Sequence, residues 1–255
     1  MKLQHVHKLD QDQQLEELQV NMSNALTRSA HSLSLSEKRI VAACIAKTDQ
    51  MPNMAQVRQR GAWLVRLSAA DYAETFGVNM NTAYEQLKGA SENLFTRYIR
   101  TERKGRKGMI EYKFRWVGGV RYHEGEGWVE LDWWHEVVPH LFGLRSEFTS
   151  YKLKQASALR SAYSWRLFEV LQSWQGTGRY QPSIEDFCLA MDVPESYKKD
   201  FKSIRIRVIE PAISELIQKN NMVITWTPQR AGRKVIGLDF KFGQNPQHSL
   251  LQEES

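Results

Sequence analysis

Lysine and arginine are concentrated in residues 198–207, in the C-terminal half of this 255-residue chain. They occupy five of the ten positions there, against a single acid, Asp200. Cationic side chains at this density bind phosphate, and the fork of an arginine can bond both acceptors on a guanine edge. The segment is therefore suited to binding a nucleic acid. Its basic residues are Lys198, Lys199, Lys202, Arg205 and Arg207.

Two helices joined by a turn must position this segment. Ser183 and Asp186 have the spacing of a capping box, which predicts the start of the first helix. Pro194 ends that helix, and the second one is expected to restart near Glu195 or Tyr197. Apolar residues at helical spacing predict the buried face of the pair: Phe187, Ala190 and Met191, then Phe201, Ile204, Val208, Ala212 and Leu216.

A short helix, a turn and a second helix with a basic N-terminal half are typical of a helix-turn-helix, whose second helix enters the DNA major groove. The alternative interpretation is a helix with an ordinary solvated charged face. The two arginines lie about 200° apart around a helix, so both cannot face one base edge. The position of the apolar face favours Arg205 as the base contact and directs Arg207 to a flanking phosphate.

An internal repeat supports the DNA-binding interpretation. Residues 68–78 align with residues 183–193 at a constant offset, and both keep a capping serine, an acid, an aromatic residue and a valine. Residues 79–97 are then predicted to form the second helix of the first copy. Its inward positions are Ala83, Leu87, Ala90 and Leu94. Its outer positions include Asn81, Thr82, Glu85 and Lys88, which make it less basic than its later counterpart.

Each copy is followed by two strand-like segments that flank a basic, glycine-containing tip. Such a tip is typical of the wing of a winged helix, because lysine and arginine reach phosphates and glycine allows a tight turn. An ordinary solvated turn is the alternative. The first tip contains Arg103, Lys104, Arg106 and Lys107, and the second contains Arg230, Arg233 and Lys234.

The order of these elements predicts an α+β protein with two tandem winged-helix domains related by a pseudo-repeat. We expect a flexible arm over residues 1–22, a first domain over 23–145, a second over 149–242 and a disordered tail over 243–255. Ser36 is expected to cap a helix that ends near Lys47. Short helices are also expected over residues 24–30 and over 133–144, the latter broken at Pro139, and a long amphipathic helix over 159–174.

Composition is consistent with a polyanionic partner. The net charge is +6, with a pI near 9.2. The chain has two cysteines, Cys44 and Cys188, which are expected to be reduced core residues of a cytoplasmic protein. The longest apolar run, residues 40–46, is too short to span a membrane. No spacing typical of a zinc site is present, and we expect neither a metal nor another cofactor.

Catalysis is not predicted. The chain has no phosphate-binding Gly-x-x-x-x-Gly-Lys motif, which argues against ATP hydrolysis. His5 and His7 have the pairing found in metal-dependent nicking enzymes, but no strand or catalytic tyrosine accompanies them. Two alternatives remain: a DNA nickase or recombinase with a tyrosine nucleophile, and a plain two-domain transcriptional repressor. The candidate nucleophiles are Tyr112, Tyr122 and Tyr151.

The chain resembles the theta-type replication initiators of iteron-containing plasmids over residues 21–242. The resemblance rests on Asn24-Ala25-Leu26, the segment 35–40, residues 151–174, the basic helix 201–207 and the Gly232 hairpin. It implies two winged-helix domains that bind repeated sites in double-stranded origin DNA. It also implies monomers that initiate replication, homodimers paired through the first domain that repress the protein's own gene, and contacts with host helicase, DnaA-type initiator and chaperones.

Overall fold

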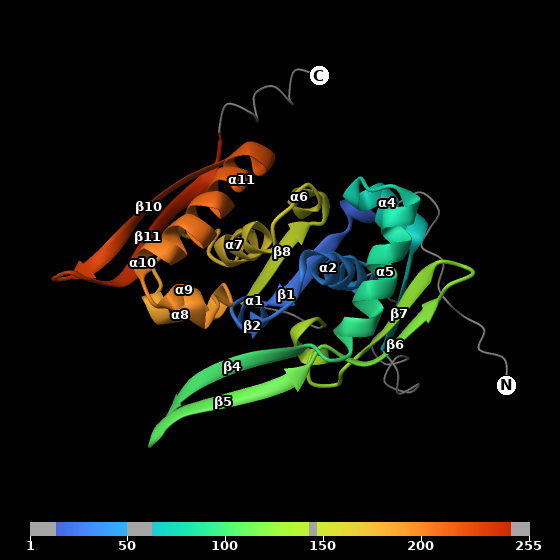
Figure 1. The fold of residues 1–255 in the computed structure, drawn as a ribbon, viewed down its shortest axis with the longest axis horizontal. Helices are drawn as coiled ribbons and strands as arrows, with labels where there is room; N and C mark the ends of the chain where they lie inside the picture. Colours follow the sequence, from blue (N-terminus) through green and yellow to red (C-terminus); the bar gives the residue numbers. More distant parts are fainter. Residues whose placement is uncertain (1–13, 50–62, 143–146, 246–255) are drawn as a thin grey trace. The chain divides into compact units, whose positions relative to one another are not determined.

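The computed structural model describes residues 14–49, 63–142 and 147–245. These residues fold into two compact units (Figure 1). The first unit contains the residues up to Leu26 together with His31–Ala158. The second contains Thr27–Ala30 and the residues from Leu159 onward. The second unit therefore begins later than the expected residue 149, and it includes a short piece from the N-terminal region.

Residues 14–22 belong to the core of the first unit, although their polar composition predicts a flexible arm. Leu18, Val20 and Met22 are at most 1% exposed. Val20 and Met22 alternate with polar residues, which is the pattern of a strand, and β1 pairs antiparallel with β8. The predicted arm is therefore wrong for residues 14–22, and residues 1–13 lie outside the described part. The elements here are η1 (Leu15–Glu17), β1 (Gln19–Ser23), α1 (Asn24–Thr27), β2 (Ala30–His31), β8 (Phe148–Lys152) and α6 (Lys154–Ser157).

Helix α2 (Leu35–Asp49) has a buried apolar face, as predicted. The backbone N–H of Glu37 donates to Ser34 Oγ at 3.4 Å, and the N–H of Ser34 donates to Glu37 Oε2 at 2.7 Å. The cap is therefore Ser34 rather than the expected Ser36, because Ser34 stands three residues before Glu37 and completes a capping box. The buried face includes Ile40, Val41, Cys44 and Ile45.

The predicted helix-turn-helix of the first unit is present, and a side chain caps each of its helices. Ser68 Oγ accepts from the N–H of Asp71 at 3.1 Å, and Asn79 Oδ1 accepts from the N–H of Thr82 at 2.8 Å. Gly77, between the helices, has a φ of 58°, a conformation that glycine adopts without strain. The buried positions of the second helix are those predicted: Ala83, Leu87, Ala90 and Leu94. The elements are α4 (Ala69–Phe76) and α5 (Met80–Leu94).

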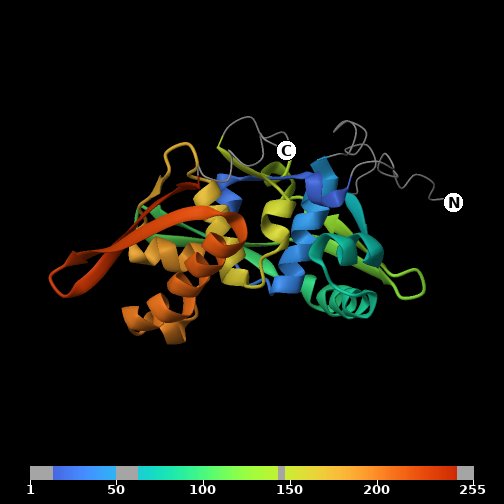
Figure 2. The ribbon, with the colours of Figure 1, turned by 90° about the horizontal axis from the view of Figure 1, so that it is seen from above.

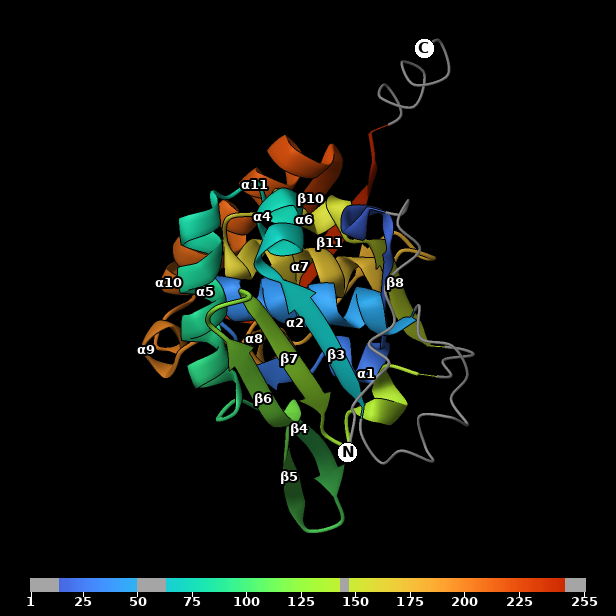
Figure 3. The same cartoon turned by 90° about the vertical axis from the view of Figure 1, so that its right-hand side faces the viewer.

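The main sheet of the first unit has the order β3-β7-β6 and packs with α2, α4 and α5 (Figure 3). The chain makes a separate long hairpin between α5 and β6, which we call the basic hairpin. Its strands β4 and β5 pair in register from Tyr98 with Arg115 to Gly105 with Gly108. The strands are β3 (Leu64–Ser68), β4 (Tyr98–Gly105), β5 (Gly108–Arg115), β6 (Val117–His123) and β7 (Trp128–Trp133).

The helix expected over residues 133–144 does not form. Trp133 is the last residue of β7 and pairs with Val117. The chain then makes turns, followed by one 3-10 turn, η2 (Val138–His140), which contains Pro139. Strand pairing with a residue distant in the sequence overrides the local helical pattern here. Residues 143 and 144 lie outside the described part.

The second unit is built around α7 (Ala162–Gln172), which is capped by Ser161 and buried on almost all sides. This confirms a helix within residues 159–174, although the helix is shorter than expected and is buried rather than amphipathic. The guanidinium of Arg166 donates to the carbonyl oxygen of Ser29 at 2.7 Å and also to that of Ala190. Arg166 therefore ties the short N-terminal piece of this unit to its helix-turn-helix.

The remaining elements of the second unit repeat the order of the first. A helix-turn-helix is followed by a long hairpin, β10–β11 (Figure 2), and the sheet order is β10-β11-β9. The last strand ends at Gln244, so residues 243 and 244 belong to β11 rather than to the expected tail, and residues 246–255 lie outside the described part. The elements are β9 (Arg179–Tyr180), α8 (Ile184–Ala190), α9 (Glu195–Lys198), α10 (Phe201–Ile204), η3 (Arg205–Ile209), α11 (Glu210–Asn220), β10 (Met222–Ala231) and β11 (Lys234–Gln244).

Candidate nucleic-acid interface

The first helix of the second helix-turn-helix begins as predicted. Ser183 Oγ accepts from the backbone N–H of Asp186 at 3.0 Å. Phe187, Ala190 and Met191 are at most 2% exposed. The ring of Phe187 stacks on Phe240 of β11 with centroids 5.8 Å apart, which joins the helix to the sheet.

The second recognition helix, which we define as residues 201–220, begins later than expected. Asp200 caps it, because its Oδ1 accepts from the backbone N–H of Ser203 at 2.8 Å. This hydrogen bond lowers the pKa of the Asp200 carboxyl below its usual value. Lys198 and Lys199 precede the cap and lie on or beside the separate short helix α9. The expectation that they share the recognition helix is therefore wrong, since an aspartate after them starts a new helix.

A widened turn interrupts the recognition helix at η3, which has π-helical geometry. The N–H of Glu210 donates to the carbonyl oxygen of Arg205, five residues earlier. Pro211 explains this turn, because proline has no N–H to donate and its ring crowds the carbonyl one turn earlier. This turn was not predicted from the sequence, although Pro211 inside an apolar helical stripe is the signal that indicates it.

Three basic side chains in the N-terminal half of this helix are exposed, and the two arginines have separate partners. Lys202 is exposed near the N-terminal end. Arg205 Nε lies 3.4 Å from Glu210 Oε1. The guanidinium of Arg207 lies over the ring of Tyr197, 4.9 Å from its centroid. The stripe that orients them is mostly buried as predicted: Ile204, Val208, Ala212 and Leu216 are at most 3% exposed.

The tip of the β10–β11 hairpin brings together the three other basic residues predicted for this unit. Arg230, Arg233 and Lys234 are all exposed. Gly232 has a φ of 61°, which allows the tight turn between the strands. Arg230 Nη1 donates to the carbonyl oxygen of Arg233 at 3.2 Å, so that its guanidinium lies across the tip.

The first unit has a different wing from the one that its sequence indicates. In the second unit, the strand before the helix-turn-helix pairs with the second strand of the wing hairpin. The matching pair in the first unit is β3 with β7, so its wing is the β6–β7 hairpin. The basic hairpin β4–β5 is inserted in the chain between α5 and that wing. The prediction that residues 103–108 form the tip of the first wing is therefore wrong. The first hairpin after α5 is not the hairpin that pairs with β3.

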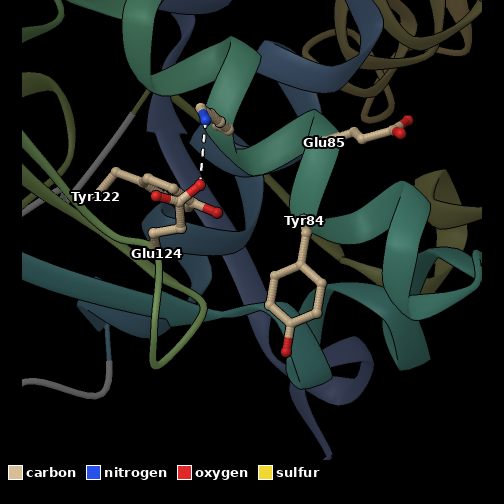
Figure 4. A pocket seen from close by; sticks show the side chains of 5 residues that line it. Tyr84, Glu85, Tyr122 and Glu124 are labelled. Atoms are coloured by element: carbon tan, nitrogen blue, oxygen red, sulfur yellow. Dashed lines mark hydrogen bonds and ion pairs between the residues drawn. The ribbon is translucent and has the colours of Figure 1, made fainter.

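The wing of the first unit is acidic rather than basic. Its tip, residues 123–127, contains Glu124 and Glu126. Glu124 Oε1 lies 3.2 Å from Lys88 Nζ, and this contact raises the pKa of the Lys88 ammonium. These groups line a shallow surface pocket of about 270 Å³, in which Glu85 extends away from Glu124 (Figure 4). The pocket is lined by Tyr84, Glu85, Lys88, Tyr122 and Glu124.

The predicted polar residues of the first unit remain accessible. Asn81 and Lys88 are exposed, and Thr82 is half-buried on the first turn of α5. The four basic residues predicted at the tip of the basic hairpin are all exposed: Arg103, Lys104, Arg106 and Lys107. Lys88 is the one among these whose charge is already matched by an acid of its own unit.

Two of the three tyrosines considered as nucleophiles are buried or hydrogen-bonded. Tyr151 is 2% exposed. The hydroxyl of Tyr112 donates to Glu136, which raises the pKa of Tyr112 and disfavours its phenolate. Cys44 and Cys188 are buried and form no disulfide, and burial raises the pKa of Cys44 to about 12. Among the described residues, no three His, Cys, Asp or Glu side chains are grouped to hold a metal ion. His5 and His7 lie outside that part.

None of the helices in residues 14–49, 63–142 and 147–245 is long and apolar enough to cross a membrane. The two units define a tandem winged-helix protein, and the second unit exposes basic residues on its second recognition helix and its hairpin tip. The chain belongs to the family of initiator replication proteins, because residues 19–172 match the family model "Initiator Replication protein, WH1" and residues 183–242 match "Initiator Rep protein, WH2".

Known relatives agree with this family. A "Replication initiation protein" from Escherichia coli is 24% identical over 244 residues, covering 94% of this chain and 74% of the relative. An "Uncharacterized 27.6 kDa protein" from the same species is 24% identical over 234 residues, covering 90% and 96%. The Pi initiator protein, crystallised in complex with iteron DNA, has the same fold, with a TM-score of 0.73 at 19% identity, covering 91% of this chain and 99% of that one.

Proposed function

We propose that this chain initiates plasmid replication by binding repeated sites, iterons, in double-stranded origin DNA. The observation that supports this most is the second winged helix, whose recognition helix and hairpin tip both expose basic residues. The Pi initiator, which shares the fold, was crystallised with iteron DNA. Action on plasmid DNA implies that the protein works in the cytoplasm of a bacterial host.

The second unit is proposed to supply sequence recognition. Arg205 would bond a guanine edge, while Arg230 and Arg233 would bind phosphates. The first unit would add contacts that are mostly to the backbone. The remaining proposed phosphate contacts are Lys198, Lys199, Lys202, Arg207 and Lys234 in the second unit and Arg103, Lys104, Arg106 and Lys107 on the basic hairpin. Asn81 and Thr82 are proposed to face DNA from α5, with Lys88 beside them, whose charge Glu124 already balances.

Footprinting on the DNA that flanks the gene tests the proposal. Two recognition helices in one chain should reach successive major-groove faces about one helical turn apart, so a monomer should protect roughly two turns. Protected direct repeats in register would support an iteron initiator, and protection of a single half-turn would contradict tandem binding. The same DNA incubated with Mg²⁺ should stay unbroken, whereas strand cleavage would favour a nickase.

Salt dependence tests whether the basic residues contact phosphate. If the protein neutralises about six to ten phosphates, the logarithm of affinity should fall with the logarithm of salt concentration at a slope of roughly −5 to −9. A slope near −2 would mean that most of these charges face solvent in the complex.

Origin opening separates an initiator from a plain repressor, because both would bind the same sites. If the protein is an initiator, its binding to supercoiled origin DNA should make thymines reactive to permanganate. Linear control DNA should gain few reactive thymines. Binding without reactive thymines would favour the repressor. Host helicase, DnaA-type initiator and chaperones are proposed partners from the family resemblance, and replication in an extract lacking each one tests them singly.

A homodimer is proposed to form through the first unit and to repress the protein's own gene. Strand β5 lies at the end of its sheet, and Met109, Ile110 and Tyr112 on it are 64%, 43% and 48% exposed. An exposed apolar edge strand is a template for pairing with a second copy. Ile110→Lys should shift the protein toward monomer in analytical ultracentrifugation and relieve repression of a reporter. An unchanged mass would contradict this interface.

A further inference from the structure

Ile206 is an exposed apolar residue in the middle of the basic part of the second recognition helix. It is 44% exposed, and its neighbours Arg205 and Arg207 are exposed as well. Ile204 and Val208 on either side are buried. These five residues therefore place Ile206 at the centre of the helix surface that points away from the core.

The flanking arginines leave Ile206 uncovered. Arg205 is directed toward Glu210, which lies further along the helix. Arg207 is directed toward Tyr197, which precedes the helix. The two guanidinium groups are held toward partners on opposite sides of Ile206 in the chain, and the isoleucine side chain remains exposed. A positively charged border with an apolar centre results.

The major groove offers one apolar group for such a centre. The other groups that distinguish the base edges there are hydrogen-bond donors and acceptors, and only thymine presents a C5-methyl group. An isoleucine at the centre of a recognition helix can bury that methyl group but cannot bond a donor or acceptor. Its chemistry therefore selects thymine over cytosine at one position.

We propose that Ile206 contacts the C5-methyl group of a thymine in the bound site and specifies that base. This inference rests on the proposed function, because it requires the second recognition helix to enter the major groove. It adds an apolar contact to the hydrogen bonds and phosphate contacts assigned above to the basic residues.

Uracil substitution tests the contact one methyl group at a time. Each thymine of the protected site is replaced singly by uracil, which keeps base pairing and removes only the methyl group. Full-length protein should bind about fourfold more weakly at one or two positions, the effect of one buried carbon. In Ile206→Ala the same substitutions should have no effect, while other positions behave as in the parent.

Ile217→Ala is the matched control, because Ile217 is 45% exposed near the other end of the same helix. It should keep the full uracil effect. Two results would overturn the thymine contact: equal uracil effects in the parent and in Ile206→Ala, or no position at which uracil has an effect. The second result is also the one expected if Ile206 binds a protein partner instead of DNA. A second variant, Ile206→Val, should retain part of the effect.

The outcome also separates this inference from the proposed function. Specific, salt-dependent binding without any methyl effect would remove the role of Ile206 and leave the initiator intact. Absence of specific binding to DNA flanking the gene would overturn both. Unchanged thermal unfolding of the three variants, which alter only exposed side chains, verifies that differences in affinity arise at the interface.

Discussion

Arg205 and Glu210 are linked twice across the widened turn of the second recognition helix. The backbone N–H of Glu210 donates to the carbonyl oxygen of Arg205, and Arg205 Nε lies 3.4 Å from Glu210 Oε1. In an ordinary α-helix the backbone partner would be Ile209, which is buried and uncharged. The turn that Pro211 causes therefore gives Arg205 an acidic partner that orients its fork.

Replacing Glu210 by glutamine should weaken discrimination while strengthening general binding. The change removes a negative charge that faces the phosphates, so affinity for random DNA should rise several-fold at low salt. Arg205 loses its orienting partner, so the ratio of specific to random affinity should fall. Both affinities are measured by fluorescence anisotropy.

Glu195→Gln is the control for Glu210→Gln, because Glu195 forms a comparable exposed ion pair with Lys198, at 2.6 Å. It should raise random binding without changing the ratio of affinities. Identical behaviour of the two variants would show that Glu210 acts by charge alone. Neither change should alter the free energy of unfolding by more than about 1 kcal/mol, because both ion pairs are exposed.

Replacing arginines on the recognition helix should affect DNA binding differently from replacing arginines on the hairpin tip. Arg205→Ala should lose about 1–3 kcal/mol of discrimination against the wrong base. Arg230→Ala and Arg233→Ala should weaken specific and random binding about equally and flatten the salt slope by roughly one unit each. Titrations at two salt concentrations measure both quantities. An unchanged specificity ratio for Arg205→Ala would mean that another residue recognises the base.

Lys88 should contribute little to DNA binding, because Glu124 already balances its charge. Lys88→Met should leave the salt slope nearly unchanged, whereas Lys202→Met, which removes an exposed lysine of the second unit, should flatten it by about one unit. Glu124→Gln should free Lys88 and steepen the slope. A large loss for Lys88→Met would contradict the view that the acidic wing occupies this lysine.

The first unit should lose stability as the pH falls below about 6.5. Burial lowers the pKa of His140, whose Nδ1 lies 2.7 Å from Ser23 Oγ. With the folded pKa below the unfolded value of about 6.5, the unfolded chain binds the proton more readily, and stability is lost with acidification. Thermal unfolding between pH 5 and 8 measures the effect. His140→Gln should reduce it, and the exposed His135→Gln should not.

Local signals predicted the helix-turn-helix elements well. The serines at 68 and 183 cap the predicted helices, and the predicted apolar stripes are almost entirely buried. These features depend on residues three or four positions apart, so the information lies within the segment itself. The strands of the β4–β5 and β10–β11 hairpins were predicted for the same reason, since their partners are neighbours in the chain.

Sequence patterns alone were sufficient to predict the two helix-turn-helix units, their basic hairpins and the likeness to replication initiators. Tertiary structure decided which hairpin is the wing of the first unit, because β3 pairs with β7 across a long stretch of chain and no local pattern records that choice. It also placed β1 in the core through β8. Local residue spacing is compatible with more than one pairing of these strands. Long-range strand pairing selects one of them, and that choice determines which side chains are exposed.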